Sequence, residues 1–227
     1  MMTVLRDLRA GARAALPIAP AYLPVAFALG AASSRLGFSA AESALWSFTM
    51  FSGANQALML SSLSSGVPLL VIAALCIAAS LRHLLYGLAL APRISASPIQ
   101  RSVFGYGLTD EVFATALTAG EGQSRPLRGP WLIALGLTVL LVWVAGTGMG
   151  NAAGDALQAV SPHLASTLDF ALPALFLALV LAMARRSLHL PMLLAASIAA
   201  LLLGLGRPEL AVPLAALAAL LPRRRTA

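Results

Sequence analysis

Long apolar runs, separated by short polar or proline-containing gaps, dominate this sequence. Eight such runs predict helices, at residues 14–33, 40–62, 67–91, 100–118, 130–150, 168–184, 189–206 and 209–221. The run at 67–91 has the length of a membrane-spanning helix, whereas the last two are short. The pattern predicts an all-α fold: a polytopic transmembrane helix bundle of about eight hydrophobic segments, forming a single membrane domain over residues 1–227.

Three of these segments are expected to be irregular. The first contains Pro17, Pro20 and Pro24, which remove backbone donors and predict a kinked, interior helix. We expect it to be an uncleaved helix; a signal peptide is the alternative, because basic residues precede the run. The second segment is weakly apolar, which a discontinuous or re-entrant helix would explain. The fourth carries Asp110 and Glu111, so it must be shielded by other helices or lie outside the hydrocarbon.

Composition places the chain among membrane proteins. Of 227 residues, 59% are hydrophobic and 10% are charged, and the mean hydropathy is +0.88. The net charge of +7 comes from Arg without any Lys, and much of it lies near segment ends, which is typical of topology signals rather than of nucleic-acid binding. Arg at both ends of the chain predicts that both termini lie in the cytoplasm. The Arg distribution favours six full crossings, and hydrophobic length favours eight, which we expect.

Arg82 and His83 lie inside the third apolar run rather than at its flank. A central Arg costs roughly 2.5 to 3.5 kcal/mol in a membrane helix, so it needs a partner or a polar cavity. Tyr86 follows within one helical turn of both residues. Pairing Arg82 with Asp110 or Glu111 would satisfy both charges. The alternative is that Arg82 extends toward the nearby interface and that the two acids are hydrated at a loop end.

Small and polar residues interrupt the second segment at Ser52, Gly53, Asn55 and Gln56. Such a composition favours a locally unwound backbone, whose free amides and carbonyls can hold a polar solute. The alternative for Asn55 and Gln56 is hydrogen bonding to neighbouring helices, which is common for amides in membranes.

The sequence offers little support for a metal site, a cofactor or an enzyme. His83 has no second His or carboxylate at ligand spacing, so it is a proton relay or a neutral hydrogen-bonding group more readily than a metal ligand. Cys76 is the single cysteine and lies within an apolar run, where packing is its expected role. Nucleotide-binding and zinc motifs are missing, and so are the motifs of intramembrane proteases. We therefore expect a protein that is not an enzyme and has no cofactor.

Several blocks along the chain resemble a known family. They are PVAFALG at 24–30, FSGANQ at 51–56, LRHLLYGLALAP at 81–92, YGLTDEVFA at 106–114 and LDFALPALF at 168–176. Together, and in this order, they are similar to the AzlC family of branched-chain amino acid permeases. The resemblance implies an inner-membrane exporter of valine, leucine and isoleucine that works with a small membrane subunit of the AzlD type. It also favours transport driven by the proton gradient.

An amino-acid substrate would need a cation for its carboxylate, oxygen atoms for its ammonium group and an apolar pocket for its side chain. The candidate substrate-binding residues are Ser52, Gly53, Asn55, Gln56, Arg82, Tyr86, Trp46 and Phe51. The candidate proton-coupling residues are His83, Asp110 and Glu111. A second hypothesis is a non-transporting membrane subunit or scaffold, in which the same polar residues hold helices and a partner together.

Overall fold

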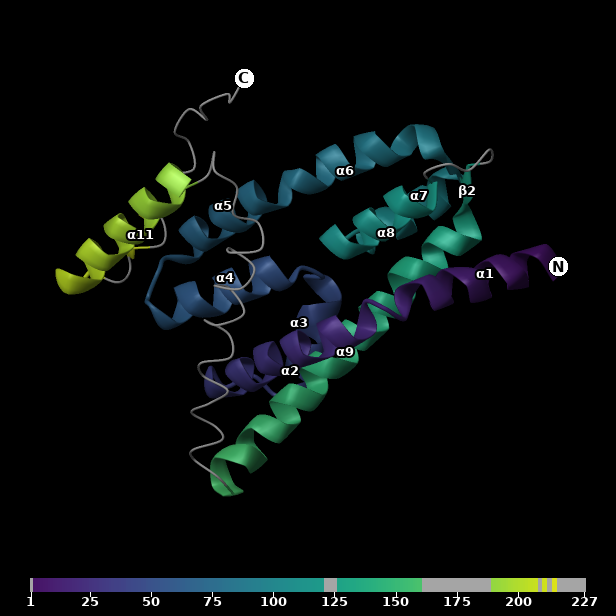
Figure 1. Cartoon of the computed structure of the whole chain (residues 1–227). Coiled ribbons are helices and arrows are strands. Elements are labelled where there is room, and N and C mark those ends of the chain that lie inside the picture. The colour runs from purple at the N-terminus through teal and green to yellow at the C-terminus, as the bar shows by residue number, and fades with distance from the viewer. Residues whose placement is uncertain (1, 121–125, 161–188, 208–209, 212–213, 216–227) are drawn as a thin grey trace.

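The computed structural model of the chain describes residues 2–120, 126–160, 189–207, 210–211 and 214–215, and nearly all of its regular structure is helical (Figure 1). The helices are α1 (Met2–Ala15), α2 (Ala19–Arg35), α3 (Ala40–Thr49), α4 (Gly53–Ser64), α5 (Leu69–Ser80), α6 (Arg82–Leu90), α7 (Pro98–Tyr106), α8 (Asp110–Gly120), α9 (Gly129–Val160) and α11 (His189–Gly204). A short 3₁₀ turn, Ala91–Arg93, follows α6. Two strands of two residues each, β1 (Ile94–Ser95) and β2 (Leu127–Arg128), pair in parallel, a small departure from the all-α prediction.

Two helical stretches in the described residues are long and apolar enough to cross a membrane, Leu69–Arg93 and Gly129–Gly154. The pair α1 and α2 adds a third if its two helices, bent by 64°, count as one broken span. The shorter apolar helix α11 occupies the predicted seventh segment. The predicted segment at 168–184 and most of the one at 209–221 lie outside the described residues. The structure therefore supports a helical membrane protein without testing the count of eight.

The irregular segments are broken at short polar or proline-containing sites. The predicted kink of the first segment is present: Pro17 lies in the bend between α1 and α2, while Pro24 is accommodated inside α2. The second segment is discontinuous, as predicted: α3 ends at Thr49 and α4 begins at Gly53. Ser52 caps α4, because its side-chain oxygen accepts from the backbone N–H of Asn55. The fourth segment also breaks, between Tyr106 and the start of α8.

Helices α2 and α9 form the frame of the molecule. In Figure 1, α2 runs along the middle of the long α9, and α1 lies against its upper part. The buried core joins this pair to α4 and α8, with Leu29, Leu60, Val112 and Leu135 among its most enclosed side chains. Burial is uneven, since 50% of the most apolar window of Gly129–Gly154 is buried, against 11% for Leu69–Arg93. The α5–α6 pair is therefore the more loosely enclosed of the two candidate spans.

Glycines allow α2 and α9 to approach backbone to backbone. A Cβ atom on Gly30 would lie 2.0 Å from the Thr147 carbonyl oxygen, and one on Gly150 would lie 2.0 Å from the Phe27 carbonyl oxygen. Close approach at small residues is a common way to pack helices in membranes, where apolar burial between helices gives little driving force. A hydrogen-bonded cluster of Asn151, Ser33 and Ser43 closes the end of this contact.

We predict that Gly150→Ala destabilises the protein by about 1 to 3 kcal/mol, because the added methyl group meets rigid backbone rather than a movable side chain. Gly148→Ala is the matched control on the same helix, since its Cβ would lie 3.5 Å from the Ala44 Cβ, an ordinary contact. Thermal unfolding of the two variants in detergent measures the difference. Equal unfolding temperatures for both variants would contradict the packing described for α2 and α9.

Candidate functional site

The beginning of α8 brings together the charged residues that the sequence singled out. Arg82 Nη1 lies 3.2 Å from Asp110 Oδ2, so one of the two predicted pairings of Arg82 is confirmed. The Tyr86 hydroxyl donates to the other carboxylate oxygen, Asp110 Oδ1, at 2.6 Å. Both partners come from α6, within the span-length stretch Leu69–Arg93. Asp110 is thus held by two groups from one helix end.

Glu111 has a different partner, one that the sequence reasoning missed. Its Oε2 atom is in hydrogen-bond contact with the Tyr22 hydroxyl of α2, which also lies 2.8 Å from Thr109 Oγ1. Tyr22 is buried, whereas Glu111 is exposed and Asp110 is partly exposed. The acidic doublet therefore divides between two helices, with Asp110 joined to α6 and Glu111 joined to α2.

The local sequence explains why the acids gather here. Thr109 caps α8, since its Oγ1 accepts from the Val112 amide at 3.4 Å. Asp110 and Glu111 then occupy the first turn of α8, where the helix dipole favours negative charge. The cap also divides the predicted fourth segment, so that Tyr106 ends α7 and Asp110 begins α8.

The interrupted second segment meets α5 at Asn55. Its amide nitrogen donates to Ser80 Oγ at 2.8 Å, and the side chain is 6% exposed. Its amide oxygen is buried without a hydrogen-bond partner in the described structure, and so is Arg82 Nε. Unsatisfied polar atoms of this kind are uncommon in folded proteins and call for an explanation.

His83 continues the chain of contacts along α6. Its Nδ1 atom lies 3.0 Å from the Ser80 carbonyl oxygen, which can only accept, so Nδ1 carries the proton. The His83 ring also packs edge-on against Tyr86, with centroids 5.6 Å apart. Tyr86 in turn stacks on Phe113 of α8, at 4.3 Å. With Nδ1 protonated, Nε2 of the neutral ring is a hydrogen-bond acceptor.

Gln56 is fully enclosed and joins three helices. Its side-chain nitrogen donates to Ser47 Oγ of α3 at 2.8 Å, and its oxygen accepts from the Trp143 indole of α9 at 2.8 Å. The Trp143 ring then packs edge-on against Tyr22, with centroids 5.0 Å apart. Gln56 therefore has the helix-bridging contacts that formed the alternative interpretation of this residue.

The remaining residues of the second segment shape the break. The Phe51 ring is buried and lies 6.4 Å from that of Trp143, and a Cβ on Gly53 would lie 2.8 Å from the same indole. Trp46 packs against Phe38, with its indole nitrogen buried and without a partner in the described structure. Cys76 is buried in a small apolar cluster between α4 and α5, which confirms its predicted packing role.

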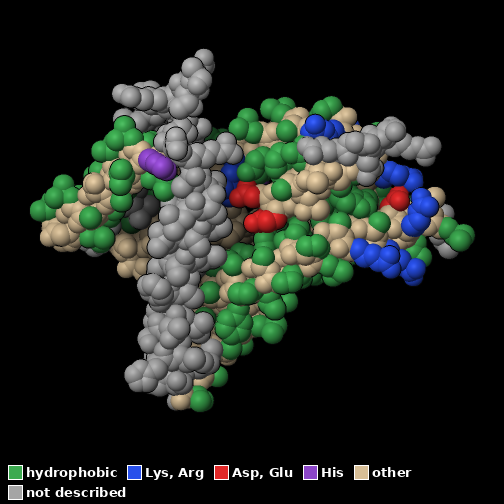
Figure 2. Space-filling view, viewed as in Figure 1, with side chains coloured by type: hydrophobic (Ala, Val, Ile, Leu, Met, Phe, Trp, Pro, Cys, Tyr) green, Lys and Arg blue, Asp and Glu red, His purple; other side chains and the backbone are tan. Residues whose placement is uncertain are grey.

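The site is open rather than enclosed. In Figure 2, acidic and basic side chains meet near the middle of this face, while most other charged side chains lie toward the right-hand end, where α1 and β2 are located. The side chains of Arg82 and Asp110 are 31% and 41% exposed. Within the described residues, no group of three His, Cys, Asp or Glu side chains could hold a metal ion.

Two signals in the sequence point to the residues that were missed. Tyr22 carries a polar group between two prolines of an otherwise apolar segment. Trp143 lies well inside the fifth segment, whereas Trp in membrane proteins is enriched at the interfaces. Both residues are polar at one end and buried, and their partners became visible only with the fold.

The fold and the site define a helical membrane protein with a charged, hydrogen-bonded site beside a span-length apolar helix. Comparison with known proteins identifies the family. Residues 17–157 match the family described as AzlC protein, and the chain belongs to the AzlC family.

Named relatives agree with this assignment. The chain is 37% identical to Inner membrane protein YgaZ of Escherichia coli over 78% of this chain and 73% of that protein. It is 36% identical to an Uncharacterized membrane protein of Archaeoglobus fulgidus, over 76% and 74%. It is 26% identical to the Branched-chain amino acid transport protein AzlC of Bacillus subtilis, over 71% and 62%. No solved structure matches the chain.

Proposed function

We propose that this chain is a secondary transporter that exports branched-chain amino acids across the inner membrane. Family membership supports a role in membrane transport, and the name of the Bacillus subtilis relative supports the substrate class. In this proposal both termini are cytoplasmic, a small AzlD-type subunit assists, and the proton gradient drives export. The chain acts without a cofactor and is not an enzyme.

The observation that carries the proposal is the Arg82–Asp110 ion pair, together with the unsatisfied side-chain oxygen of Asn55, whose amide nitrogen binds Ser80 two residues before Arg82. A functional cation in a span is expected to face a partner that a substrate can replace. A substrate carboxylate would compete with Asp110 for Arg82, and Asn55 Oδ1 would accept from the substrate ammonium group. Asn55 lies in the first turn of α4, which begins after Ser52. The first backbone N–H groups of this helix carry a partial positive charge that favours an anionic group of a substrate.

The apolar part of the substrate needs a surface as well as charges. Phe51, Trp46 and Tyr86 are the aromatic residues proposed for this role, and Phe51 lies at the break itself. Gln56 takes part indirectly, because both ends of its amide already bind Ser47 and Trp143. It would hold the start of α4 in place while Asn55 contacts the substrate.

Proton coupling would use the separate partners of the two acids. A substrate that takes Arg82 from Asp110 would leave that carboxylate without its counter-charge, and in this proposal Asp110 then receives a proton. Glu111 is exposed and in contact with Tyr22, so a proton can reach it, and His83 offers a further relay beside Tyr86.

The alternative function is a membrane scaffold without transport activity. The observation in its favour is that the side chains of Gln56 and Asn151 form hydrogen bonds to residues of other segments. Such contacts fix helix positions whether or not a substrate crosses. The two functions differ in whether Asn55 and Arg82 act on a solute.

Efflux of labelled valine from cells expressing this chain, with and without the small subunit, tests the proposal. We expect efflux above that of cells carrying an empty vector, with the small subunit increasing it. A matched chain with Asn55→Ala should insert in the membrane and export less. Efflux equal to the empty vector in both the presence and the absence of the small subunit would favour the scaffold.

A further inference from the structure

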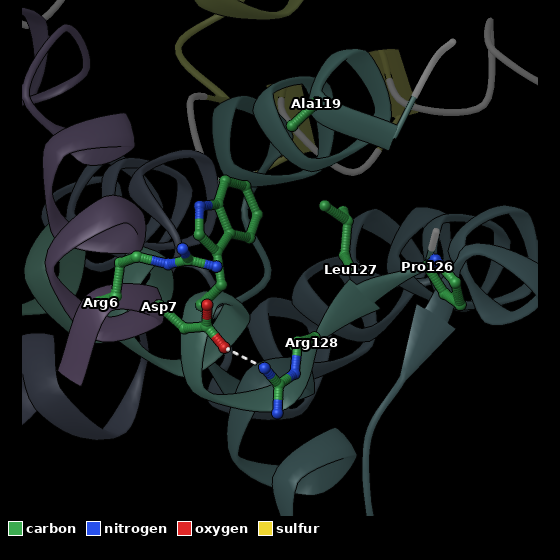
Figure 3. A pocket seen from close by; sticks show the side chains of 7 residues that line it. Arg6, Asp7, Ala119, Pro126, Leu127 and Arg128 are labelled. Atoms are coloured by element: carbon green, nitrogen blue, oxygen red, sulfur yellow. Dashed lines mark ion pairs between the residues drawn. The ribbon is translucent and has the colours of Figure 1, made fainter. Parts of the chain in front are cut away.

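A second cluster of charges lies at the beginning of α9, near the C-terminal end of α8 and away from the acidic residues at its start. The residues around it line a hollow of ≈ 330 Å³ and are Arg6, Asp7, Ala119, Pro126, Leu127, Arg128 and Trp131. Figure 3 shows Arg6 reaching into this hollow from α1, with Arg128 on its other side. A neighbouring hollow of ≈ 340 Å³ on α1 is lined by Arg6, Arg9 and Arg13 together with apolar side chains. Arg6 lines both hollows and joins them into one surface.

The charges of this surface are unevenly satisfied. Asp7 Oδ2 lies 3.1 Å from Arg128 Nη1, the ion pair drawn in Figure 3. No ion pair with an acid in the described part of the chain involves Arg6, Arg9 or Arg13. All three are exposed, and they recur on one face of α1 at helical spacing. The surface therefore has an excess of positive charge after its one acid is paired.

Its position in the fold indicates which anion it would meet. Arg128 immediately precedes the candidate span Gly129–Gly154, so the hollow lies where that span reaches the membrane surface. Trp131, in the first turn of α9, is the residue type enriched at this depth. Basic residues at the cytoplasmic interface face the more anionic leaflet.

Apolar side chains lie beside the basic ones. Leu127 and Trp131 line the first hollow, and Met2 and Leu5 line the second. Met2 and Leu5 are exposed on α1 although they are apolar. A ligand with both a negative head and apolar chains would cover both kinds of surface, which a free inorganic ion would not do.

We propose that the surface formed by Arg6, Arg9, Arg13 and Arg128 binds the phosphodiester head group of an anionic phospholipid. The guanidinium groups would donate charge-assisted hydrogen bonds to the phosphate oxygens. The apolar residues beside them would lie against the start of the acyl chains. The site shares no lining residue with the charged cluster at the start of α8 and does not depend on the proposed transport activity.

Native mass spectrometry of the full-length chain in detergent tests this assignment. The protein is mixed with dioleoyl phosphatidylglycerol or with dioleoyl phosphatidylcholine, and the retained lipid is counted. We expect preferential retention of phosphatidylglycerol. We also expect Arg6→Gln to lower that retention by about fivefold, because one basic residue near an anionic head group is lost.

Arg207→Gln is the charge-matched control. It follows α11, which lies at the opposite end of Figure 1 from α1, and its variant should retain phosphatidylglycerol as the unaltered chain does. Arg6 is exposed, so the unfolding temperature of Arg6→Gln should be unchanged. Equal retention of the two lipids, or equal losses in the two variants, would overturn the proposal. Displacement of phosphatidylglycerol by inorganic phosphate would assign the surface to the free ion and would overturn it as well.

Discussion

Arg82→Ala is expected to lower valine efflux about tenfold or more while changing membrane abundance far less, because the proposed charge-assisted bond to the substrate would be lost. Arg82 lies within an apolar stretch of span length and holds Asp110 at 3.2 Å. Its Nε atom is buried without a hydrogen-bond partner in the described structure, so the guanidinium is not fully satisfied by Asp110. Labelled-valine efflux and quantitative immunoblotting of membranes give the two numbers to compare.

Two further variants separate substrate binding from ion pairing. Arg93→Ala removes an exposed Arg from the end of the same stretch and should leave efflux unchanged. Arg82→Ala combined with Asp110→Ala removes the unpaired carboxylate that the single change leaves behind, so abundance should recover. Efflux should stay low in this double variant. Its recovery to the unaltered rate would assign Arg82 to folding instead of substrate binding.

Glu111→Gln is expected to uncouple transport from the proton gradient. The variant should still exchange valine down its own gradient but should no longer export it against one. Glu111 is exposed and contacts Tyr22 of the α2–α9 frame, whereas Asp110 is tied to Arg82 and Tyr86 of α6. Of the two acids, Glu111 is therefore the one that can gain and lose a proton without breaking the ion pair. Efflux measured with and without an imposed pH gradient checks this result.

Changes at two other acids, Asp110 and Glu42, provide the comparison with Glu111→Gln. Asp110→Asn with Glu111→Gln should show the same loss of uphill export, with weaker valine exchange in addition. Glu42→Gln changes an exposed acid whose side chain bonds to Ser39 at the start of α3, and coupling should be normal. If Glu111→Gln still drives uphill export with a normal response to pH, the acidic doublet reverts to a structural role.

The pairing of Arg82 with Asp110 was predictable from the sequence because the cost of isolated charges in a membrane leaves few arrangements. The same cost cannot say which of two adjacent acids is chosen. In the structure Thr109 caps α8, so Asp110 and Glu111 are successive residues of its first turn and point in different directions. The Thr-Asp-Glu order is a recognisable helix start, but the surrounding apolar run made one continuous segment appear more plausible.

Other parts of the site depend on contacts that spacing does not encode. Tyr22 and Glu111 are 89 positions apart, and Gln56 and Trp143 are 87 apart. Periodicity identifies a face of a helix, but it gives no register between helices of similar hydropathy. The break at Ser52 could be predicted because small polar residues interrupt an apolar run locally. The bridging of Gln56 to two other helices required the packing of α9.

The difference in burial between the two candidate spans bears on how the molecule can move. Helices α2 and α9 touch through backbone atoms at Gly30 and Gly150, so sliding one along the other would create immediate overlap. The α5–α6 pair, with 11% of its apolar window buried, meets α8 through side chains instead: the ion pair, the tyrosine hydrogen bond and the stacking of Tyr86 on Phe113. Hydrogen bonds and ion pairs between side chains can be replaced by bonds to a solute, whereas the close packing of two helix backbones cannot be replaced in this way. We therefore expect the α5–α6 pair, rather than α2 or α9, to move during a conformational change. Because lipid tails would contact most of its surface, its tilt should change with bilayer thickness.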